Sequence, residues 1–236
     1  MEWSFNFNFA KNKNEVVSLY DANTKQIVMG TSQGGVSLAA IPGLPLGVIK
    51  GRGHVYHANG QPLVDEDGYY VTKADQILGN VNPDWIGGVG TSFRWKDLSI
   101  GVQVDAKVGG NIFSLDRYYG DYSGLYPETA GLNDKGKPVR SPVADGGGIK
   151  MPGVKEDGTP NDVYTSATNS DEAPFGINAS PGNYIYDATF VKLREVNLTY
   201  SFKNILFANS KFVKGIDLSL VGRNLAILYK DLPYAD

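Results

Sequence analysis

Residues 88–108 have the sequence GVGTSFRWKDLSIGVQVDAKV, in which apolar and polar side chains alternate over an unusual length. Side chains on a strand point to alternate faces, so the second half of this segment has one continuous apolar face. A tilted barrel strand of about eleven residues crosses a bilayer, whereas a strand of a soluble sandwich usually has about 5–6 residues. The segment therefore predicts a hairpin of a transmembrane β-barrel, with a tight turn at Trp95–Asp97. Its apolar face consists of Leu98, Ile100, Val102, Val104, Ala106 and Val108.

Three other segments show strand patterns of the same kind. Residues 2–10 alternate aromatic residues with serine and asparagine. Residues 216–228 alternate leucine and isoleucine with aspartate and serine, and their phase changes near Gly222–Asn224. The apolar phase also changes within residues 186–202, which predicts a β-bulge near Arg194–Glu195, because one extra residue shifts the alternation.

These strands would place large aromatic residues at one end of the sheet. If short turns join the strands on one side, Trp3, Trp95, Tyr200 and Phe202 fall at the same membrane interface, as an aromatic girdle requires. The sequence thus predicts an all-β chain of antiparallel strands from a transmembrane β-barrel, about five to seven strands in all, with long extracellular loops. Because single-chain bacterial barrels use even strand numbers and must close, we expect residues 1–236 to be a fragment of a longer barrel domain.

The segments between these strands have weaker patterns. In residues 15–87, turn-forming residues predict hairpin turns at Asn59-Gly60 and Asp67-Gly68. Residues 109–185 have little periodicity, which is unusual for a compact soluble domain but typical of the outer loops of a barrel. Short strands are expected at 16–19, 26–30 and 44–57, and residues 204–215 are expected to connect the last two long strands.

The composition excludes several classes of protein. The chain has 22 Lys and Arg against 25 Asp and Glu, a formal charge of −3, and no cysteine. Nucleic-acid binding needs a basic surface, and thiolate catalysis or a cysteine zinc site needs cysteine, so neither is expected. No apolar run is long enough for a transmembrane helix. The first residues, MEWSFNFNFAKNKN, lack the basic and apolar regions of a signal peptide, which favours a processed chain or a fragment.

Several segments together resemble the C-terminal barrel of SusC/RagA-type TonB-dependent outer-membrane transporters. The motifs that carry the resemblance are NPDWIGG, FVKLREVNLTY and GRNL, and their combination is more specific than any one of them. The similar segments cover a little under half of the chain and span residues 3–19, 44–56, 78–114, 188–202 and 216–230.

The resemblance implies that the intact parent protein imports glycans or peptides across the outer membrane of a Gram-negative bacterium. In this family an N-terminal plug closes the barrel, TonB supplies energy, and a SusD-like surface lipoprotein caps the outer side. The implied partners are therefore outer-membrane lipid, a SusD-like lipoprotein, an oligosaccharide or peptide substrate, and TonB through a plug domain that this chain does not include. No cofactor and no nucleic acid are implied.

An aromatic cluster with one carboxylate follows the hairpin and is the best candidate for substrate contact. Aromatic faces stack on sugar rings, and aspartate accepts hydrogen bonds from hydroxyl groups. The alternatives are packing within the loop, tyrosines at the membrane interface, and contact with the lipoprotein. The candidate residues are Tyr118, Tyr119, Asp121, Tyr122 and Tyr126.

Other polar groups favour structural roles. Residues 64–68 carry carboxylates without the spacing of a calcium loop, so a hairpin turn is expected. His54 and His57 would lie on opposite faces of a strand, which favours packing over a metal site. Neither a nucleophile elbow nor a pair of catalytic carboxylates stands out, so an enzyme is not expected.

Two positively charged side chains, Lys192 and Arg194, test the barrel interpretation, because their position in the alternation would place them on the lipid-facing side. Lys192 and Arg194 share the phase of Tyr200, on the apolar face. A lysine or arginine facing lipid at the midplane costs about 2–4 kcal/mol, so either the predicted bulge turns both side chains away or they lie above the lipid.

The alternative is a soluble, β-rich carbohydrate-binding or adhesion module whose long loops carry the tyrosines. The two interpretations differ in what the apolar strand faces contact. A soluble module packs them into a core, whereas a barrel exposes them to lipid.

Overall fold

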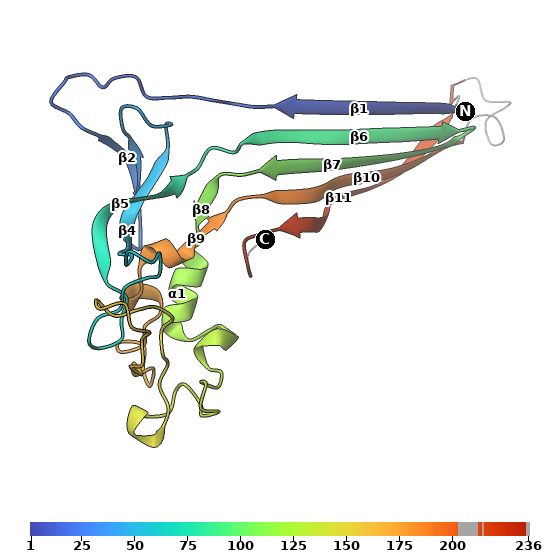
Figure 1. The fold of residues 1–236 in the computed structure, drawn as a ribbon. Coiled ribbons are helices and arrows are strands. Elements are labelled where there is room, and N and C mark those ends of the chain that lie inside the picture. The colour runs from blue at the N-terminus through green and yellow to red at the C-terminus, as the bar shows by residue number, and fades with distance from the viewer. Residues whose placement is uncertain (203–211, 214, 235–236) are drawn as a thin grey trace.

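The computed structural model describes residues 1–202, 212–213 and 215–234. Its main feature is an antiparallel sheet of five long strands in the order β1-β6-β7-β10-β11, which run side by side in Figure 1. The all-β prediction is confirmed, and the sheet is open, with β1 and β11 at its edges. The strands are β1 (Glu2–Ala10), β6 (Trp85–Trp95), β7 (Leu98–Val108), β10 (Phe190–Phe202) and β11 (Ile216–Lys230).

One face of this sheet is apolar and exposed across all five strands. Directly paired residues of antiparallel strands share a face, and Phe93 pairs with Trp3 on one side and with Ile100 on the other. Ile100 in turn pairs with Leu198, and Leu198 with Leu220. The exposed fraction of these side chains is 70% at Trp3, 44% at Ile100 and 73% at Leu220. The predicted hairpin and its apolar face are therefore confirmed.

The predicted β-bulge lies at Arg194. The pairing of β10 with both β7 and β11 shifts between Leu193 and Glu195, so Arg194 is the extra residue. The shift returns Leu193 to the apolar face, opposite Val104. It also moves Lys192 to the polar face, where it lies opposite Asp105. The bulge thus removes the two charges from the apolar face, as the barrel interpretation requires.

The predicted aromatic residues gather at the end of the sheet where the tight turn between Trp95 and Leu98 joins β6 to β7. Trp3 pairs with Phe93, and Leu98, which follows the tight turn, pairs with both Trp95 and Tyr200. Lys96 makes the turn with a φ of 53°. Most of the predicted connection 204–215 lies outside the described residues.

A second antiparallel sheet, in the order β2-β3-β4-β5, lies beyond the opposite end of the long strands (Figure 1). Its strands are β2 (Ile27–Ser32), β3 (Val36–Ala40), β4 (Val48–His54) and β5 (Thr72–Asn80). In its two central strands, β3 and β4, side chains are buried: Val36, Ala39, Val48 and Ile49 form its core, whereas β2 is exposed. The expected strands near 26–30 and 44–57 are confirmed as β2 and β4, whereas 16–19 forms no strand, and β3 and β5 were not predicted.

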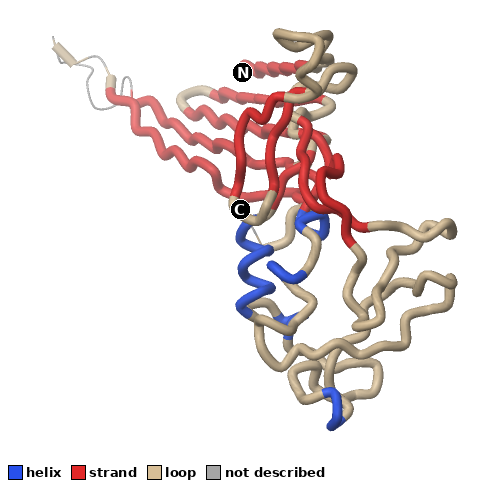
Figure 2. Tube along the Cα trace, turned by 90° about the vertical axis from the view of Figure 1, so that its left-hand side faces the viewer, coloured by secondary structure: helices blue, strands red, loops and turns tan. Residues whose placement is uncertain are grey.

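The rest of the chain forms a region of loops and short helices, drawn mostly in tan in Figure 2. We call residues 55–71 and 111–187 the loop body. It was predicted as irregular, yet it contains one α-helix and a two-stranded sheet of β8 and β9. Its elements are β8 (Asn111–Phe113), α1 (Leu115–Ser123), the 3-10 helices η1 (Pro127–Thr129), η2 (Val143–Asp145), η3 (Gly176–Asn178) and η4 (Pro181–Tyr184), and β9 (Ile185–Asp187).

Four hairpin turns of one kind build much of the loop body. Each has the same backbone hydrogen bonds; for example, Gly60 N donates to His57 O and His57 N to Gln61 O, both at 2.9 Å. The fourth residue of each turn is a glycine in the left-handed region. The predicted turns at Asn59-Gly60 and Asp67-Gly68 are thereby confirmed. The turns span residues 57–61, 65–69, 133–137 and 155–159.

Candidate functional site

The predicted aromatic cluster lies on and beside helix α1, at the end of the sheet that carries the loop body (Figure 1). The Ser114 hydroxyl caps the first turn of α1 by accepting a hydrogen bond from Arg117 N at 3.3 Å. Gly124 ends the helix with a φ of 74°. Ser114, an acidic Asp116 in the first turn and Gly124 are the sequence signals that could have predicted this helix.

Two members of the cluster, Tyr118 and Asp121, are buried on the inner face of α1. Their exposed fractions are 5% and 6%. The Tyr118 ring packs edge-on against the ring of Tyr184, with centroids 5.4 Å apart, and both belong to a small core with Ala179. Tyr184 also accepts a hydrogen bond from Gly176 N at 2.7 Å. These contacts hold the loop body on the helix.

Asp121 has its charge compensated inside the loop body. Its Oδ2 lies 3.2 Å from the guanidinium of Arg117, which also forms an ion pair with Glu128. Burial raises the pKa of the Asp121 carboxyl above its ordinary value, although Arg117 and Tyr184 act in the opposite direction. Burial likewise raises the pKa of Tyr184. This network orders the interior of the loop body.

The other three tyrosines of the cluster are more accessible. Tyr119 is 39% exposed and is the most available ring. Tyr122 donates a hydrogen bond from its hydroxyl to Asp171 at 2.9 Å. Tyr126 packs on Tyr234, with ring centroids 4.7 Å apart, and beneath the Arg117 guanidinium at 4.4 Å. The structure thus separates the cluster into two buried residues and three at or near the surface.

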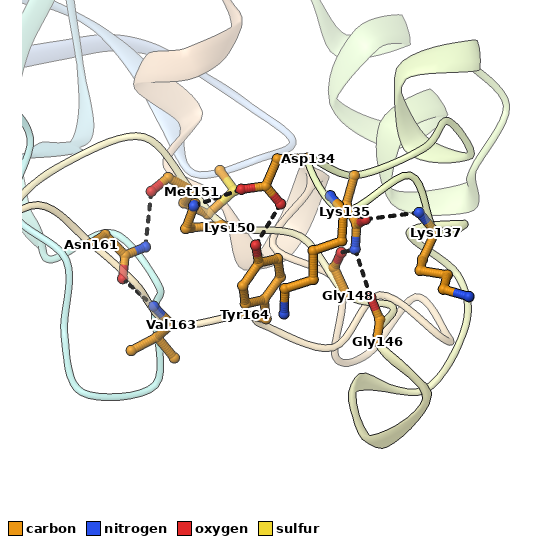
Figure 3. Close-up of polar contacts among 11 residues, drawn as sticks. Asp134, Lys135, Lys137, Gly146, Gly148, Lys150, Met151, Asn161, Val163 and Tyr164 are labelled. Carbon is orange, nitrogen blue, oxygen red and sulfur yellow. Dashed lines mark hydrogen bonds and ion pairs between the residues drawn. The ribbon is translucent and has the colours of Figure 1, made fainter.

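A second aromatic and charged group, which was not predicted, lies within the loop body (Figure 3). Tyr164 donates its hydroxyl proton to Asp134 at 2.5 Å, and Lys150 lies 2.7 Å from the same carboxylate. Lys135 Nζ lies 3.5 Å from the centroid of the Tyr164 ring, within cation–π range. Hydrogen bonds with Lys150 and Tyr164 hold the pKa of Asp134 below its ordinary value.

Two asparagines fix the loops around this group. Asn133 donates to the carbonyls of Gly146 and Gly148 at 2.9 and 3.1 Å. Asn161, buried in the loop body, donates to Met151 O at 2.9 Å and accepts from Val163 N at 3.0 Å (Figure 3). Such side-chain bonds replace strand pairing in a region with little regular structure.

The groups for which structural roles were expected have such roles. His54 hydrogen-bonds Asn183 and packs edge-on against Tyr70 at 4.5 Å. His57 accepts a hydrogen bond from Asn59 N within its hairpin turn. Residues 65–69 form one of the four turns. Within the described residues, no group of three or more His, Asp or Glu side chains is arranged to hold a metal ion.

The polar face of the five-stranded sheet carries hydrogen-bonded and ion-paired side chains. Arg194 lies 2.8 Å from Asp105 across β7 and β10, and Arg223 lies 3.0 Å from Glu195 across β10 and β11. At the turn end, the hydroxyls of Ser4 and Ser92 are 2.7 Å apart. The two faces of the sheet are therefore chemically opposite over its whole width.

No helix in the described part of the chain has the length and apolar character needed to span a membrane.

Comparisons with known proteins give a likeness of fold. No protein-family model matches the chain, and no curated protein matches it. A solved structure described as the RagAB peptide transporter matches 97% of this chain with a TM-score of 0.58 and 19% identity. A structure of the RagAB peptide importer in the "closed-closed" state matches 97% with a TM-score of 0.58 and 20% identity. The chain spans 23% and 24% of the length of those chains, so it has the fold of a region of RagAB transporter chains.

Proposed function

We propose that this chain forms part of the wall and the extracellular loops of a SusC/RagA-like, TonB-dependent outer-membrane importer. In this proposal residues 1–236 belong to the C-terminal barrel domain of a longer protein. The role is binding and transport, with no enzymatic step. The observation that carries the proposal is the five-stranded sheet with one exposed apolar face and one polar face.

The exposed apolar face supports lipid as its neighbour. Leu218, Leu220 and Phe7 are more than half exposed, at 66%, 73% and 64%. Soluble monomers rarely expose an apolar surface of this breadth, because each buried square ångström of apolar area contributes about 25 cal/mol. A soluble binding module would bury this face in a core, as the β2–β5 sheet does with Val48 and Ile49. The arrangement favours the barrel over the soluble alternative.

The proposed partners follow from this placement. The polar face would line the lumen and meet the plug region that TonB engages, and the loop body would meet a SusD-like lipoprotein. A peptide substrate is supported by the likeness to structures described as a peptide transporter. An oligosaccharide substrate is supported by the exposed ring of Tyr119, with Tyr122 and Tyr126 nearby as further candidate contacts.

Cysteine scanning along β1 tests this proposal directly, because residues 1–236 contain no cysteine, and any cysteine elsewhere in the parent protein would first be replaced by serine. In the full-length parent protein, reconstituted in liposomes, single cysteines would replace Phe5, Asn6, Phe7 and Asn8 in turn. We expect a fluorophore at 5 and 7 to be quenched by brominated lipid chains, and cysteines at 6 and 8 to react with a water-soluble maleimide from the lumen. Tyr20, in a connecting loop and 82% exposed, supplies a control that reacts with maleimide in either case.

Two results would contradict the proposal. The first is equal lipid quenching at odd and even positions of β1, which would mean that the strand does not separate lipid from lumen. The second is a parent protein that stays monodisperse and folded without detergent, which would favour the soluble binding module.

A further inference from the structure

Strand β2 is a free edge of the second sheet. It pairs with β3 only, and among the described residues its backbone forms no hydrogen bond with any other segment. Its sequence, IVMGTS, contains no charged residue and no proline, which are residues that usually keep an edge strand from pairing further. The pairing with β3 shifts once, at Met29, and residues 30–32 continue past the shift in regular register. This short stretch therefore offers unpaired backbone donors and acceptors to another extended chain.

An apolar hollow lies beside the same stretch. It has a volume of about 290 Å³, and residues 30–32 form one of its walls. The other walls come from β3, β4, β8 and the segment that follows β5, and no charged residue lines the hollow. Pockets that hold small ligands begin at about 300 Å³, so the hollow is large enough for an apolar side chain. Its apolar lining consists of Val36, Leu38, Ile49, Val81, Ile112 and Phe113.

The glycine at position 30 leaves the hollow open at the strand. Gly30 pairs with Leu38, and Leu38 pairs with Ile49, so the three residues share one face of the sheet. A methyl group built on Gly30 would have no atom within 4 Å. A glycine inside a strand often marks a place where another backbone or a ligand approaches closely. The space that a side chain at residue 30 would occupy is therefore available to the side chain of a ligand.

The hollow adjoins the polar face of the five-stranded sheet. Ile112, which is 41% exposed, lines both this hollow and a neighbouring one that is bordered by Lys107 and Phe190. Lys107 and Phe190 are directly paired on the polar face, at the end of the sheet that carries the loop body. Because the proposed function turns the polar face toward the lumen, it places the hollow and the edge of β2 at the outer mouth of the lumen.

We propose that β2 binds an extended segment of a transported peptide by strand addition, with an apolar side chain of the peptide in the hollow. Strand addition supplies backbone hydrogen bonds, and the pocket beside the strand selects the side chain. A peptide is favoured over an oligosaccharide, because a free strand edge matches the spacing of donors and acceptors in another peptide chain. This inference rests on the proposed function, and it assigns to that function a substrate class and a binding site.

Binding of capped, uncharged hexapeptides to the full-length parent protein in detergent tests the chemistry of the ligand. One peptide has a central leucine, and its counterpart has alanine in that place. We expect the leucine peptide to bind roughly ten times more tightly, because its side chain buries more apolar area. Two further versions of the leucine peptide carry N-methyl groups on alternate residues, in the two possible phases. An extended chain pairs along one edge through every second residue, so one phase should lose binding and the other should keep it.

The variant Gly30→Cys tests the place of binding, in a parent protein whose other cysteines are replaced by serine. The φ of Gly30 lies outside the left-handed region and its surroundings are open, so a cysteine fits there. We expect its thiol to react with a maleimide in the free protein and the leucine peptide to slow this reaction. The modified protein should bind the peptide roughly ten times more weakly. Because the maleimide fills the hollow after folding, this loss does not report a folding defect.

Gly131→Cys is the matched control. Gly131 also has open surroundings, with its nearest neighbour at 4.0 Å, and it lies in the loop body. Its thiol should react at the same rate with and without the peptide. After modification this variant should bind the leucine peptide like the natural protein.

Several results would overturn the inference. A thiol in Gly30→Cys that does not react in the free protein would mean that another strand of the parent already covers β2. The same response to both phases of N-methylation would exclude pairing along one edge. Full binding to the modified Gly30→Cys protein, or no binding of any peptide, would remove the site from β2. The importer proposal is decided separately, by the cysteine scan of β1, so its failure is distinguishable from the failure of this site.

Discussion

At the scale of single residues, helix α1 buries Tyr118 of the aromatic cluster and exposes Tyr119, so we expect one residue to contribute to stability and the other to substrate binding. We expect Tyr119→Ala to weaken substrate binding roughly threefold to tenfold without changing stability, because this ring is exposed and truncation leaves no cavity. Tyr118→Ala should instead destabilise the loop body by about 3–5 kcal/mol, as truncations of buried aromatics do. Ligand titration and thermal unfolding of each variant measure both effects. Tyr20→Ala is the control, and equal effects at 118 and 119 would contradict this division.

The Asp121 carboxyl gives the loop body a definite response to pH. Because burial raises the pKa of Asp121 above its unfolded value, the folded state keeps the proton where the unfolded chain has lost it. The contribution of this group to stability is therefore largest below the unfolded pKa, falls as pH rises through the folded pKa, and is then constant. Thermal unfolding of Asp121→Asn between pH 3 and 7 should lack this fall. An increase of the Asp121 contribution with pH would mean that the Arg117 ion pair outweighs burial.

Two glycines of the loop body provide a matched test of backbone packing. A methyl group at Gly147 would lie 2.0 Å from the carbonyl oxygen of Ser141, whereas at Gly131 the nearest atom is the Pro127 carbonyl oxygen at 4.0 Å. Gly147→Ala should therefore destabilise the loop body by about 1–3 kcal/mol or more, and Gly131→Ala by less than about 0.5 kcal/mol. Limited proteolysis in increasing urea measures the difference. Equal resistance of the two variants would show that the 141–147 segment relaxes easily.

At the scale of elements, the bulge in β10 is the feature that keeps one strand amphipathic over its whole length. Deleting Arg194 removes the extra residue, so residues 190–193 would present Lys192 to the apolar face and Val191 and Leu193 to the polar face. We expect the deletion to abolish folding of the parent barrel, measured as loss of the heat-modifiable band on gels. Deletion of Lys13, which lies in the β1–β2 connection, should be tolerated. A folded deletion variant would mean that the register of β10 is not fixed by the bulge.

Some strands and helices could be predicted from sequence signals alone, and others could not. The long strands were predictable because alternation over nine or more residues leaves only one assignment, and even the bulge at Arg194 followed from a change of phase. β3 and α1 were missed for a different reason. Val36–Ala40 is buried or half-buried at every position, so it lacks the exposed polar face that produces a clear alternation, and α1 is a nine-residue helix whose stability comes from packing of Tyr118 on Tyr184.

The candidate site was predictable only in part, because the burial of its residues also depends on tertiary contacts. The composition of residues 118–126 identified the tyrosines, but which of them are buried depends on contacts with residues far along the chain, such as Ala179 and Tyr184. The ion pairs Arg194–Asp105 and Arg223–Glu195 were not predictable from spacing, because their members come from neighbouring strands and meet only through the register of those strands. Long-range pairing places these groups together, and local sequence does not encode it.

At the scale of the whole molecule, the opposite faces of the sheet imply opposite responses to the same substitution. Val102 and Gln103 are neighbours in the middle of β7, but Val102 is on the apolar face, opposite Thr91 and Val196. If that face meets lipid, Val102→Arg should destabilise the parent barrel by about 2–4 kcal/mol, whereas Gln103→Arg, facing the lumen, should change stability by less than about 1 kcal/mol. Reversible unfolding in urea with liposomes measures both values. A Val102→Arg variant as stable as Gln103→Arg would remove the lipid contact on which the importer proposal depends.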